Sequence, residues 1–411
     1  MNYELFIAKR IISGKEHKSS ISYPIIKIAI TAISLGVIIM MIAIATGGGL
    51  REKIRTKISG FKGHIQITNY DANNSDVSII PIDKNQDFYP NFSSVEGIKN
   101  VQVFANQVGL IRTKDDFEGI VFKGVSSDYD WTFFQEYLIS GKLPNFNQIR
   151  TRDVLLSKTI MDRLQLQLND TINVTFFKNQ NNKLPSNRKL IITGIYNTGF
   201  LEFDKNIIIG DLRQVQRLNK WNENQVGGFE IILENFDDLQ QKSNEIYKEI
   251  DATLDATSII SNYPGIFEWI ELFDNNSWFI IIIMILVAGI NMITALLVLI
   301  LERVSMVGIL KALGSSDWSI RKIFLYNASY LIIVGLFWGN LIGITILLLQ
   351  KHIGFIALDP ETYYVSQVPV SIDLLSIIIL NIGTLVLCFV MLIIPSVIIT
   401  KIQPSKSIRF A

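Results

Sequence analysis

Four long apolar stretches dominate the pattern of hydrophobic and polar positions along the chain. These stretches cover residues 24–46, 278–301, 323–349 and 374–399. Every other window of similar length contains several charged residues. A helix needs about 20 apolar residues to cross a bilayer. The pattern therefore predicts four transmembrane helices, with boundaries at 24–47, 275–301, 323–350 and 373–400.

The first stretch has an alternative interpretation as a cleaved signal peptide, because Ala43-Ile44-Ala45 resembles a cleavage site. However, this stretch is longer than the about 7–15 apolar residues of a signal peptide, and a long leader precedes it. The length favours a retained membrane anchor.

Residues 48–274, between the first two stretches, have the mixed composition of a globular domain. Apolar residues at helical spacing predict helices over 157–168 and 237–250. Short runs of β-branched and aromatic residues predict strands over 64–70, 101–112, 117–125, 171–177 and 189–196. These elements do not alternate as βαβ units, so we expect a large α+β domain inserted between transmembrane helices 1 and 2.

Two segments that flank this domain, 50–58 and 266–273, are compatible with helix and extend the first two apolar stretches. If both helices continue, they form stiff stalks through which motion in the membrane moves the domain. The alternative is that they are short interfacial helix ends, with Trp269 as an anchor at the membrane surface.

Lys and Arg residues are concentrated in the N-terminal segment 1–23, the loop 302–322 and the tail 401–411. The loop 351–372 has one Lys and several acidic residues. The positive-inside rule places the first three segments in the cytoplasm and predicts a multi-pass protein of the cell inner (cytoplasmic) membrane. The basic residues within 51–62 would, by the same rule, place the end of the first span that precedes the domain in the cytoplasm. Long domains, however, cross the membrane largely regardless of charge.

Composition excludes several classes of function. With 38 Lys and Arg against 37 Asp and Glu, the net charge of +1 argues against a nucleic-acid binder. The single cysteine, Cys388, excludes a disulfide framework and a cysteine-based zinc site. The sequence has no phosphate-binding loop and no hydrolase or kinase motif. We expect a non-catalytic membrane subunit with no catalytic, cofactor-binding or metal-binding residues.

Small and polar residues mark contacts between the predicted helices. Gly335, Gly339 and Gly343 share one helix face and allow a neighbouring helix to approach closely, within this chain or in a second copy. Four asparagines within the apolar stretches predict hydrogen bonds between helices, with a polar lumen as the alternative: Asn291, Asn327, Asn340 and Asn381.

The loop after the second stretch carries the most specific motif. The string Gly308-Ile309-Leu310-Lys311-Ala312-Leu313-Gly314-Ser315-Ser316 resembles the coupling segment of the FtsX/MacB superfamily of ABC transporter permeases. The resemblance implies docking on a cytoplasmic ATP-binding subunit by Val307, Gly308, Ile309, Leu310, Lys311, Ala312, Leu313 and Gly314. Met306 stands where that family often has an acidic residue, so one polar contact to the ATP-binding subunit is not expected from the family pattern. The alternative interpretation of the loop is a cytoplasmic turn that is basic only because of the positive-inside rule.

The resemblance extends over nearly the whole chain, and several segments are similar to lipoprotein-releasing (Lol-type) permeases, among them 5–10, 194–199 and 402–409. It implies that the chain pairs with a second permease, identical or paralogous, and with two ATP-binding subunits that use ATP and Mg. The expected activity is release of outer-membrane-directed lipoproteins from the inner membrane. The alternatives are MacB-like efflux of peptides or drugs, or FtsX-like signalling to a cell-wall hydrolase without transport.

Lipoprotein release needs an apolar shelter and an acceptor. Flexible Met and other apolar residues predict an acyl-chain cavity, with lipid-facing packing as the alternative, at Val37, Met40, Met41, Met284 and Ile285. The polar loop 178–187 occupies the position of the loop that hooks the periplasmic lipoprotein carrier in the acceptor-recruiting Lol subunit, although it is shorter here. The resemblance therefore implies carrier docking at Lys178, Leu184, Pro185 and Arg188.

Overall fold

The computed structural model describes residues 3–13, 22–72, 77–114, 116–147, 150–177, 185–397 and 399. Its internal contacts divide the chain into two compact units. The helical unit comprises residues 1–51, 269–357 and 367–411, and the sheet unit comprises residues 52–268 and 358–366.

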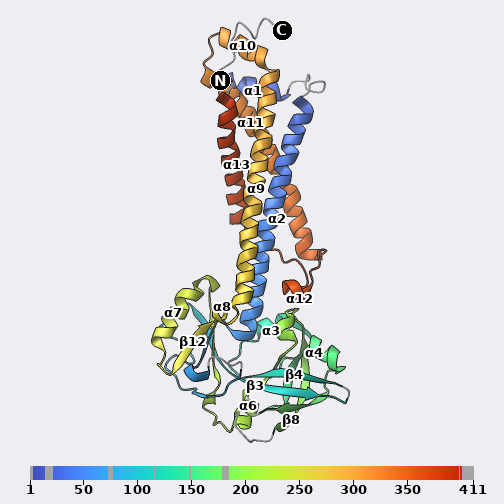
Figure 1. Cartoon of the computed structure of the whole chain (residues 1–411), viewed down its shortest axis with the longest axis vertical. Helices are drawn as coiled ribbons and strands as arrows, with labels where there is room; N and C mark the ends of the chain where they lie inside the picture. Colours follow the sequence, from blue (N-terminus) through green and yellow to red (C-terminus); the bar gives the residue numbers. More distant parts are fainter. Residues whose placement is uncertain are drawn as a thin grey trace. The chain divides into compact units, whose positions relative to one another are not determined.

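Four long and two short helices among the described residues make up the helical unit, and two of the long ones, α2 and α9, also contribute residues to the sheet unit (Figure 1). They are α1 (Tyr3–Ser13), α2 (Ser22–Lys62), α9 (Pro264–Glu302), α10 (Val304–Ala312), α11 (Asp317–Ile353) and α13 (Leu374–Ser396). Among the described residues, α2, α9, α11 and α13 are long and apolar enough to cross a membrane, as the hydropathy pattern predicted.

Both α2 and α9 are about twice as long as a membrane span requires. α2 has 41 residues and α9 has 39. The flanking segments 50–58 and 266–273 lie inside them, so the prediction that both segments are helical is confirmed.

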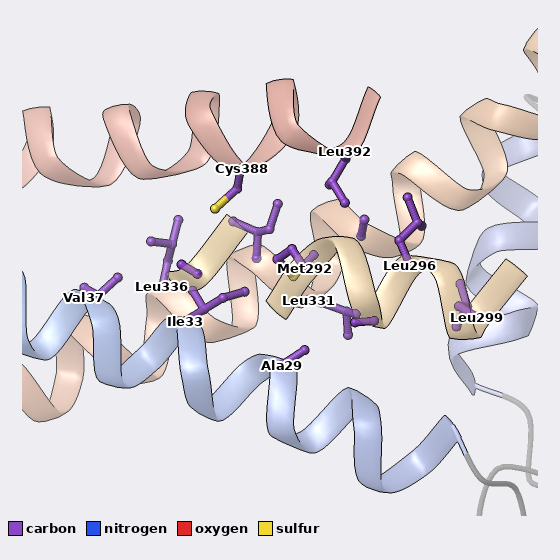
Figure 2. Packing of buried hydrophobic residues seen from close by; sticks show 14 of the residues in the cluster. Ala29, Ile33, Val37, Met292, Leu296, Leu299, Leu331, Leu336, Cys388 and Leu392 are labelled. Carbon is purple, nitrogen blue, oxygen red and sulfur yellow. The ribbon is translucent and has the colours of Figure 1, made fainter. Parts of the chain in front are cut away.

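The core of the helical unit is formed where α2, α9, α11 and α13 bring apolar side chains together (Figure 2). Gly335 and Gly339 of α11 lie directly against α2. A Cβ atom at Gly335 would lie 2.7 Å from Ile33 Cγ2, and one at Gly339 would lie 2.8 Å from Val37 Cβ. These glycines therefore allow two helices of the same chain to pack at close range.

Two of the four asparagines join helices. The side-chain amide of Asn340 in α11 donates to Asn381 Oδ1 in α13 at 2.6 Å, and that of Asn381 donates back at 2.9 Å. Asn327 instead donates to the carbonyl oxygen of Ile323 in its own helix. The prediction of interhelical hydrogen bonds is thus confirmed for the first pair and wrong for Asn327, whose amide is satisfied one turn away.

Ten strands among the described residues form one mixed sheet in the sheet unit. The order is β12-β1-β11-β3-β4-β9-β6-β8-β5, and β7 pairs with β3 and β8. Most neighbours are antiparallel, while β4–β9 and β6–β8 are parallel. The strands are β1 (Ile65–Asn69), β3 (Ile98–Arg112), β4 (Phe117–Val125), β5 (Leu138–Gly141), β6 (Asp153–Ser157), β7 (Thr171–Phe176), β8 (Ser186–Tyr196), β9 (Ile207–Asp211), β11 (Gly228–Leu233) and β12 (Leu254–Ser258).

A separate two-stranded sheet and short helices complete the sheet unit. The pair is β2 (Ile82–Asp83) with β10 (Gln225–Val226). The helices are η2 (Tyr70–Ala72), α3 (Thr132–Tyr137), α4 (Lys158–Leu164), α5 (Leu201–Asp204), α6 (Leu212–Asn219), η3 (Phe236–Asp238), α7 (Leu239–Glu249), α8 (Ile259–Asn262) and α12 (Pro360–Tyr363).

Local backbone chemistry explains why the helix predicted over 157–168 is shorter than expected. The side chain of Ser157 accepts a hydrogen bond from the backbone N–H of Ile160 and so begins α4. Gln165 adopts a left-handed conformation with φ of 53° and ends the helix. The prediction of helix over 157–168 is therefore correct at its start and too long by one turn.

A buried ion pair attaches the end of α2 to the sheet. Lys123 Nζ of β4 lies 2.7 Å from both carboxylate oxygens of Glu230 of β11, and both side chains are almost fully buried. The same Nζ donates to the carbonyl oxygen of Phe61, in the last turn of α2, at 2.5 Å. Gln66 and Gln102 also donate to Glu230, so its carboxylate is fully hydrogen-bonded within the sheet.

The segment 358–366 belongs to the sheet unit although it lies between α11 and α13 in the sequence. Lys57 Nζ of α2 donates to the carbonyl oxygen of Tyr364 at 3.1 Å. The Tyr364 ring also packs on Phe200 at 5.3 Å between centroids. A more exposed ion pair joins Lys205 to Glu361 at 3.2 Å.

Candidate functional site

The predicted coupling segment forms a short helix, α10, with two distinct sides. Val307 and Gly308 are buried against the helical core, and Met306 and Leu310 are partly buried against it. On the other side, Ile309 is 51% exposed, Leu313 is 78% exposed, and Ala312 is exposed. The segment therefore presents a short apolar edge on a helix whose opposite side is fixed.

Polar contacts hold α10 in place. Lys311 Nζ lies 2.9 Å from Asp317 Oδ1 of α11 and donates to the carbonyl oxygen of Ile399 at 2.9 Å. Gly314, with φ of 88°, allows the sharp turn that ends the segment. Ser316 then caps α11 by accepting from the N–H of Ser319. Lys311 thus joins α10 to its neighbours in the chain.

A largely apolar cavity of about 520 Å³ lies among α2, α9 and α13 in the helical unit. Of the five residues predicted to form an acyl-chain cavity, Met41 and Ile285 line it. Val37 and Met40 are fully buried in the helical core, where Val37 contacts Gly339. Met284 packs toward Gly36. The structure therefore brings two of the predicted residues to the cavity and places the others in packing between helices.

Ionised and hydroxyl groups line one part of the cavity. Arg51 of α2 forms an ion pair with Asp274 of α9, and both residues line the cavity together with Ser277 and Asp373. These charges lie just outside the apolar stretches 24–46, 278–301 and 374–399 in the sequence. The cavity thus combines apolar walls with a polar rim.

A second cleft, of about 830 Å³, lies in the sheet unit along β7, β8 and the end of β3. Its lining includes Arg112, Lys114, Arg188 and Lys189, and the described lining residues include no carboxylate. Burial lowers the pKa of the Arg188 guanidinium, and the nearby cations Arg217 and Arg150 lower it further.

The predicted carrier-docking segment 178–187 follows β7 and reaches into the start of β8 in the sequence. Lys178 and Leu184 lie outside the described residues. Pro185 immediately precedes β8, and Arg188 lies in β8 opposite Val174 of β7. Of the two predicted residues that the structure describes, Arg188 lines the second cleft, which we call the basic cleft.

Comparisons with known families cover both units. Residues 28–248 match the MacB-like periplasmic core domain, which accounts for 221 of the 411 residues, and residues 278–404 match the FtsX-like permease C-terminal domain. The chain belongs to the FtsX/MacB superfamily of ABC transporter permeases. The resemblance seen in the sequence is confirmed, and the permease is a multi-pass membrane protein with a large MacB-like domain.

Curated relatives match this permease from end to end. It is 21% identical over 428 aligned residues to the lipoprotein-releasing system transmembrane protein LolC of Neisseria meningitidis, covering 99% of each chain. It is 20% identical to the LolE protein of Haemophilus influenzae, again covering 99% of each. Among solved structures, the extracellular domain of the ABC-type transporter YknZ from Gram-positive bacteria covers 47% of the permease at 11% identity, with a TM-score of 0.33.

Some residues of the permease's candidate sites have only weak signals in the sequence. Arg51 and Asp274 are charges at the ends of separate apolar stretches, and only folding shows that they form a pair. The triplet 47–49 of glycines inside an apolar helix is a signal that could have drawn attention to the cavity. Arg112, Lys114 and Lys189 look like ordinary surface cations until β3, β7 and β8 bring them together.

Proposed function

We propose that this permease is the membrane subunit of an ATP-driven system that releases lipoproteins from the inner membrane for transfer to the outer membrane. The observation that carries the proposal is the end-to-end similarity to LolC and LolE proteins named as lipoprotein-releasing subunits. In the proposed orientation, α10 and both termini are cytoplasmic, and the MacB-like domain, inserted between the first and second spans, lies in the periplasm.

The physical problem explains why such a system requires energy. Each buried methylene group contributes about 0.8 kcal/mol, so three acyl chains of about fifteen carbons hold a lipoprotein in the membrane by on the order of 36 kcal/mol. Spontaneous release into water is negligible at that cost. Release therefore needs an energy source, an apolar shelter and a soluble acceptor.

The energy would enter through α10. Its exposed apolar edge, formed by Ile309, Ala312 and Leu313, is suited to a groove on a separate ATP-binding subunit. Its buried side and the Lys311 contacts fix it to α11, so displacement of α10 displaces the helical bundle. ATP hydrolysis belongs to that partner, and this chain contributes no catalytic residue. Two permeases, identical or paralogous, would act with two ATP-binding subunits.

The motion would reach the periplasmic domain through α2 and α9. Each is one continuous helix from its apolar stretch into residues of the sheet unit. The contact of Lys123 with the carbonyl oxygen of Phe61 attaches the last turn of α2 to the centre of the sheet. Displacement of α2 along its axis would therefore move the sheet rather than slide past it.

The basic cleft is the proposed docking site for the periplasmic carrier. Positive charge along β7, β8 and the end of β3 comes from Arg112, Lys114, Arg188 and Lys189. An acidic face on the carrier would be attracted to this charge, which would accelerate its encounter with the permease.

Depletion of the permease in its host, followed by separation of inner and outer membranes, tests the function. We expect outer-membrane lipoproteins to accumulate in the inner membrane, while a multi-pass inner-membrane protein and a β-barrel protein keep their distribution as controls. Normal lipoprotein sorting after depletion would contradict the proposal. It would favour efflux or regulation of a cell-wall hydrolase, with membership of the permease superfamily unchanged.

A further inference from the structure

The connection between α11 and α13 begins as a hydrogen-bonded hairpin, residues 354–369. Its two arms are joined by a bridge between Ala357 and Gln367, with one backbone hydrogen bond on each side of the bridge. In these bonds Val368 N donates to the carbonyl oxygen of Ile356, and Leu358 N donates to that of Ser366. The short helix α12 forms the tip. Because its arms bond to each other, the hairpin is a structured element rather than an open loop.

Gln350, in the last turn of α11, fixes the base of the hairpin. Its side-chain amide donates to the carbonyl oxygens of Ile356 at 3.3 Å and Val368 at 3.0 Å. Its Oε1 accepts from the N–H of Ile356 at 3.0 Å, and the residue is 4% exposed. One buried side chain thus bonds to both arms. Its removal would leave buried backbone groups without these partners, which is costly in a site closed to water.

The arm that leads to α13 also lies against the backbone of α2. Ser371 N donates to the carbonyl oxygen of Ala45 at 3.0 Å. A Cβ atom at Gly49, one turn further along α2, would lie 2.6 Å from the carbonyl oxygen of Pro369 and 2.8 Å from Ser371 N. Only glycine permits so close an approach of two main chains. Within the helical unit, the connection is therefore attached to both α11 and α2.

The tip of the hairpin belongs to the sheet unit, where it has its own attachments. The carbonyl oxygen of Tyr364 accepts from Lys57 Nζ, a side chain in a residue that is 3% exposed, and the Tyr364 ring packs on Phe200. A Cβ atom at Gly199 would lie 3.7 Å from Lys57 Nζ and 3.9 Å from Ser366 Oγ. The turn that carries Phe200 thus lies in contact with both Lys57 and the hairpin.

The helix that carries Gln350 is the same helix to which α10 is fixed. Lys311 of α10 pairs with Asp317, the first residue of α11, whereas Gln350 lies in the last turn. At about 1.5 Å per residue, these two positions are about 50 Å apart along one continuous helix. A displacement of α10 that moves α11 would therefore also move the base of the hairpin.

We propose that the hairpin is a second mechanical link from α10 to the sheet unit, and that Gln350 is the residue that positions it. Motion would pass along α11 to Gln350, through the two arms to Tyr364, and from there to the turn at Phe200. This path uses neither the length of α2 nor that of α9. It rests on the proposed coupling of α10 to an ATP-binding subunit, but it is independent of the cargo.

Hydrogen exchange of the full-length permease, purified with its ATP-binding partner in lipid nanodiscs, tests the proposal. Exchange is compared without nucleotide and with ATP plus vanadate, which traps the ATP-binding subunits. We expect trapping to change exchange in the hairpin and in residues 196–204 by about threefold or more. Gln350→Met keeps a long apolar side chain but loses all three hydrogen bonds to the arms, so the change at 196–204 should disappear.

The end of α2 supplies an internal control. Residues 59–66 are attached to α2 itself, so their response to trapping should persist in Gln350→Met. Asn327→Leu is the matched control on α11, because this buried amide bonds within its own helix, and the variant should respond like the unmodified protein. If Gln350→Met fails to fold, Lys57→Met detaches the tip instead and should give the same loss at 196–204.

Two results would overturn the proposal. One is an equal response of residues 196–204 in Gln350→Met and the unmodified protein, which would show that motion reaches the sheet unit without the hairpin. The other is the absence of any response at 196–204 in the unmodified protein. Because neither readout involves a lipoprotein, failure of this link is distinguishable from failure of the proposed function, which is measured by lipoprotein sorting.

Discussion

At the scale of single residues, His64 makes the sheet unit sensitive to pH. Its Nδ1 accepts a hydrogen bond from the backbone N–H of Leu233 at 2.8 Å, which requires the ring to be unprotonated at that atom. Burial, with a smaller effect of Lys99, lowers the pKa of His64 to about 4 from its usual 6.5. Between about pH 4 and 6.5, His64 is therefore mostly neutral in the folded protein and mostly protonated in the unfolded chain.

We expect the sheet unit to lose stability as the pH falls from about 6.5 to 4, because the unfolded state binds a proton there that the folded state does not. The contribution of His64 is fully present above pH 6.5 and falls by at most about 1.4 kcal/mol per pH unit. Hydrogen exchange at the Leu233 amide, corrected for the intrinsic effect of pH, measures this loss. His64→Asn keeps an acceptor without titrating, so the same pH dependence in that variant would contradict the assignment.

The buried pair of Lys123 and Glu230 leads to a second prediction at this scale. Lys123→Ala leaves the Glu230 carboxylate buried without its cation and should lower the free energy of unfolding by about 3–5 kcal/mol. Lys123→Met combined with Glu230→Gln removes both charges and should recover most of that loss. Thermal unfolding of the three proteins measures the difference. Equal stability of Lys123→Ala and the unmodified protein would show that the pair is not important for the fold.

At the scale of elements, α10 combines a fixed side with an exposed edge. Leu313→Asp changes a residue that is 78% exposed, so membrane insertion should be unaffected. Loss of a central apolar contact typically costs about 2 kcal/mol of binding or more, and we expect much less ATP-binding subunit to copurify. Leu272→Asp in α9, 63% exposed and far from α10 in the sequence, is the control and should copurify normally. Unchanged copurification of Leu313→Asp would contradict the coupling role.

The basic cleft along β7, β8 and the end of β3 is the proposed docking site of the carrier, and charge reversal tests it. Arg188→Glu combined with Lys189→Glu reverses two of the cations that line the basic cleft, and we expect crosslinking to the carrier to fall by about tenfold because like charges then repel. Lys248→Glu reverses one cation on the exposed surface of α7, away from the cleft lining, and should have little effect. If all variants crosslink equally, the carrier docks elsewhere.

At the scale of the whole molecule, the division into two units predicts independent folding. Residues 52–268 contain the complete ten-stranded sheet and its buried aromatic and aliphatic core. Expressed alone, this segment should be soluble and unfold in one cooperative transition. It lacks the segment 358–366 and its contacts with Lys57, Phe200 and Lys205, so adding a peptide of residues 356–368 should raise its melting temperature. Gradual unfolding without a transition would contradict the division.

Much of the architecture was predictable because its signals are local. Membrane-crossing helices are recognised from length and hydropathy alone, and β4 agrees with its predicted range of 117–125. The strands β5, β6, β9, β11 and β12 were not predicted, because strand formation depends strongly on the neighbouring strands that pair with each segment.

The sequence by itself determined the class of this protein: four apolar stretches long enough to cross a membrane, a mixed composition over residues 48–274, and a loop motif that resembles ABC permeases. Such features depend on the composition and order of neighbouring residues. The tertiary structure decided which residues meet: Arg51 with Asp274, Lys123 with Glu230 from positions 107 residues apart, and the cations of the basic cleft. Those contacts depend on strand order and helix packing, which arise from burial of the whole chain at once and leave no periodic signal in any one segment.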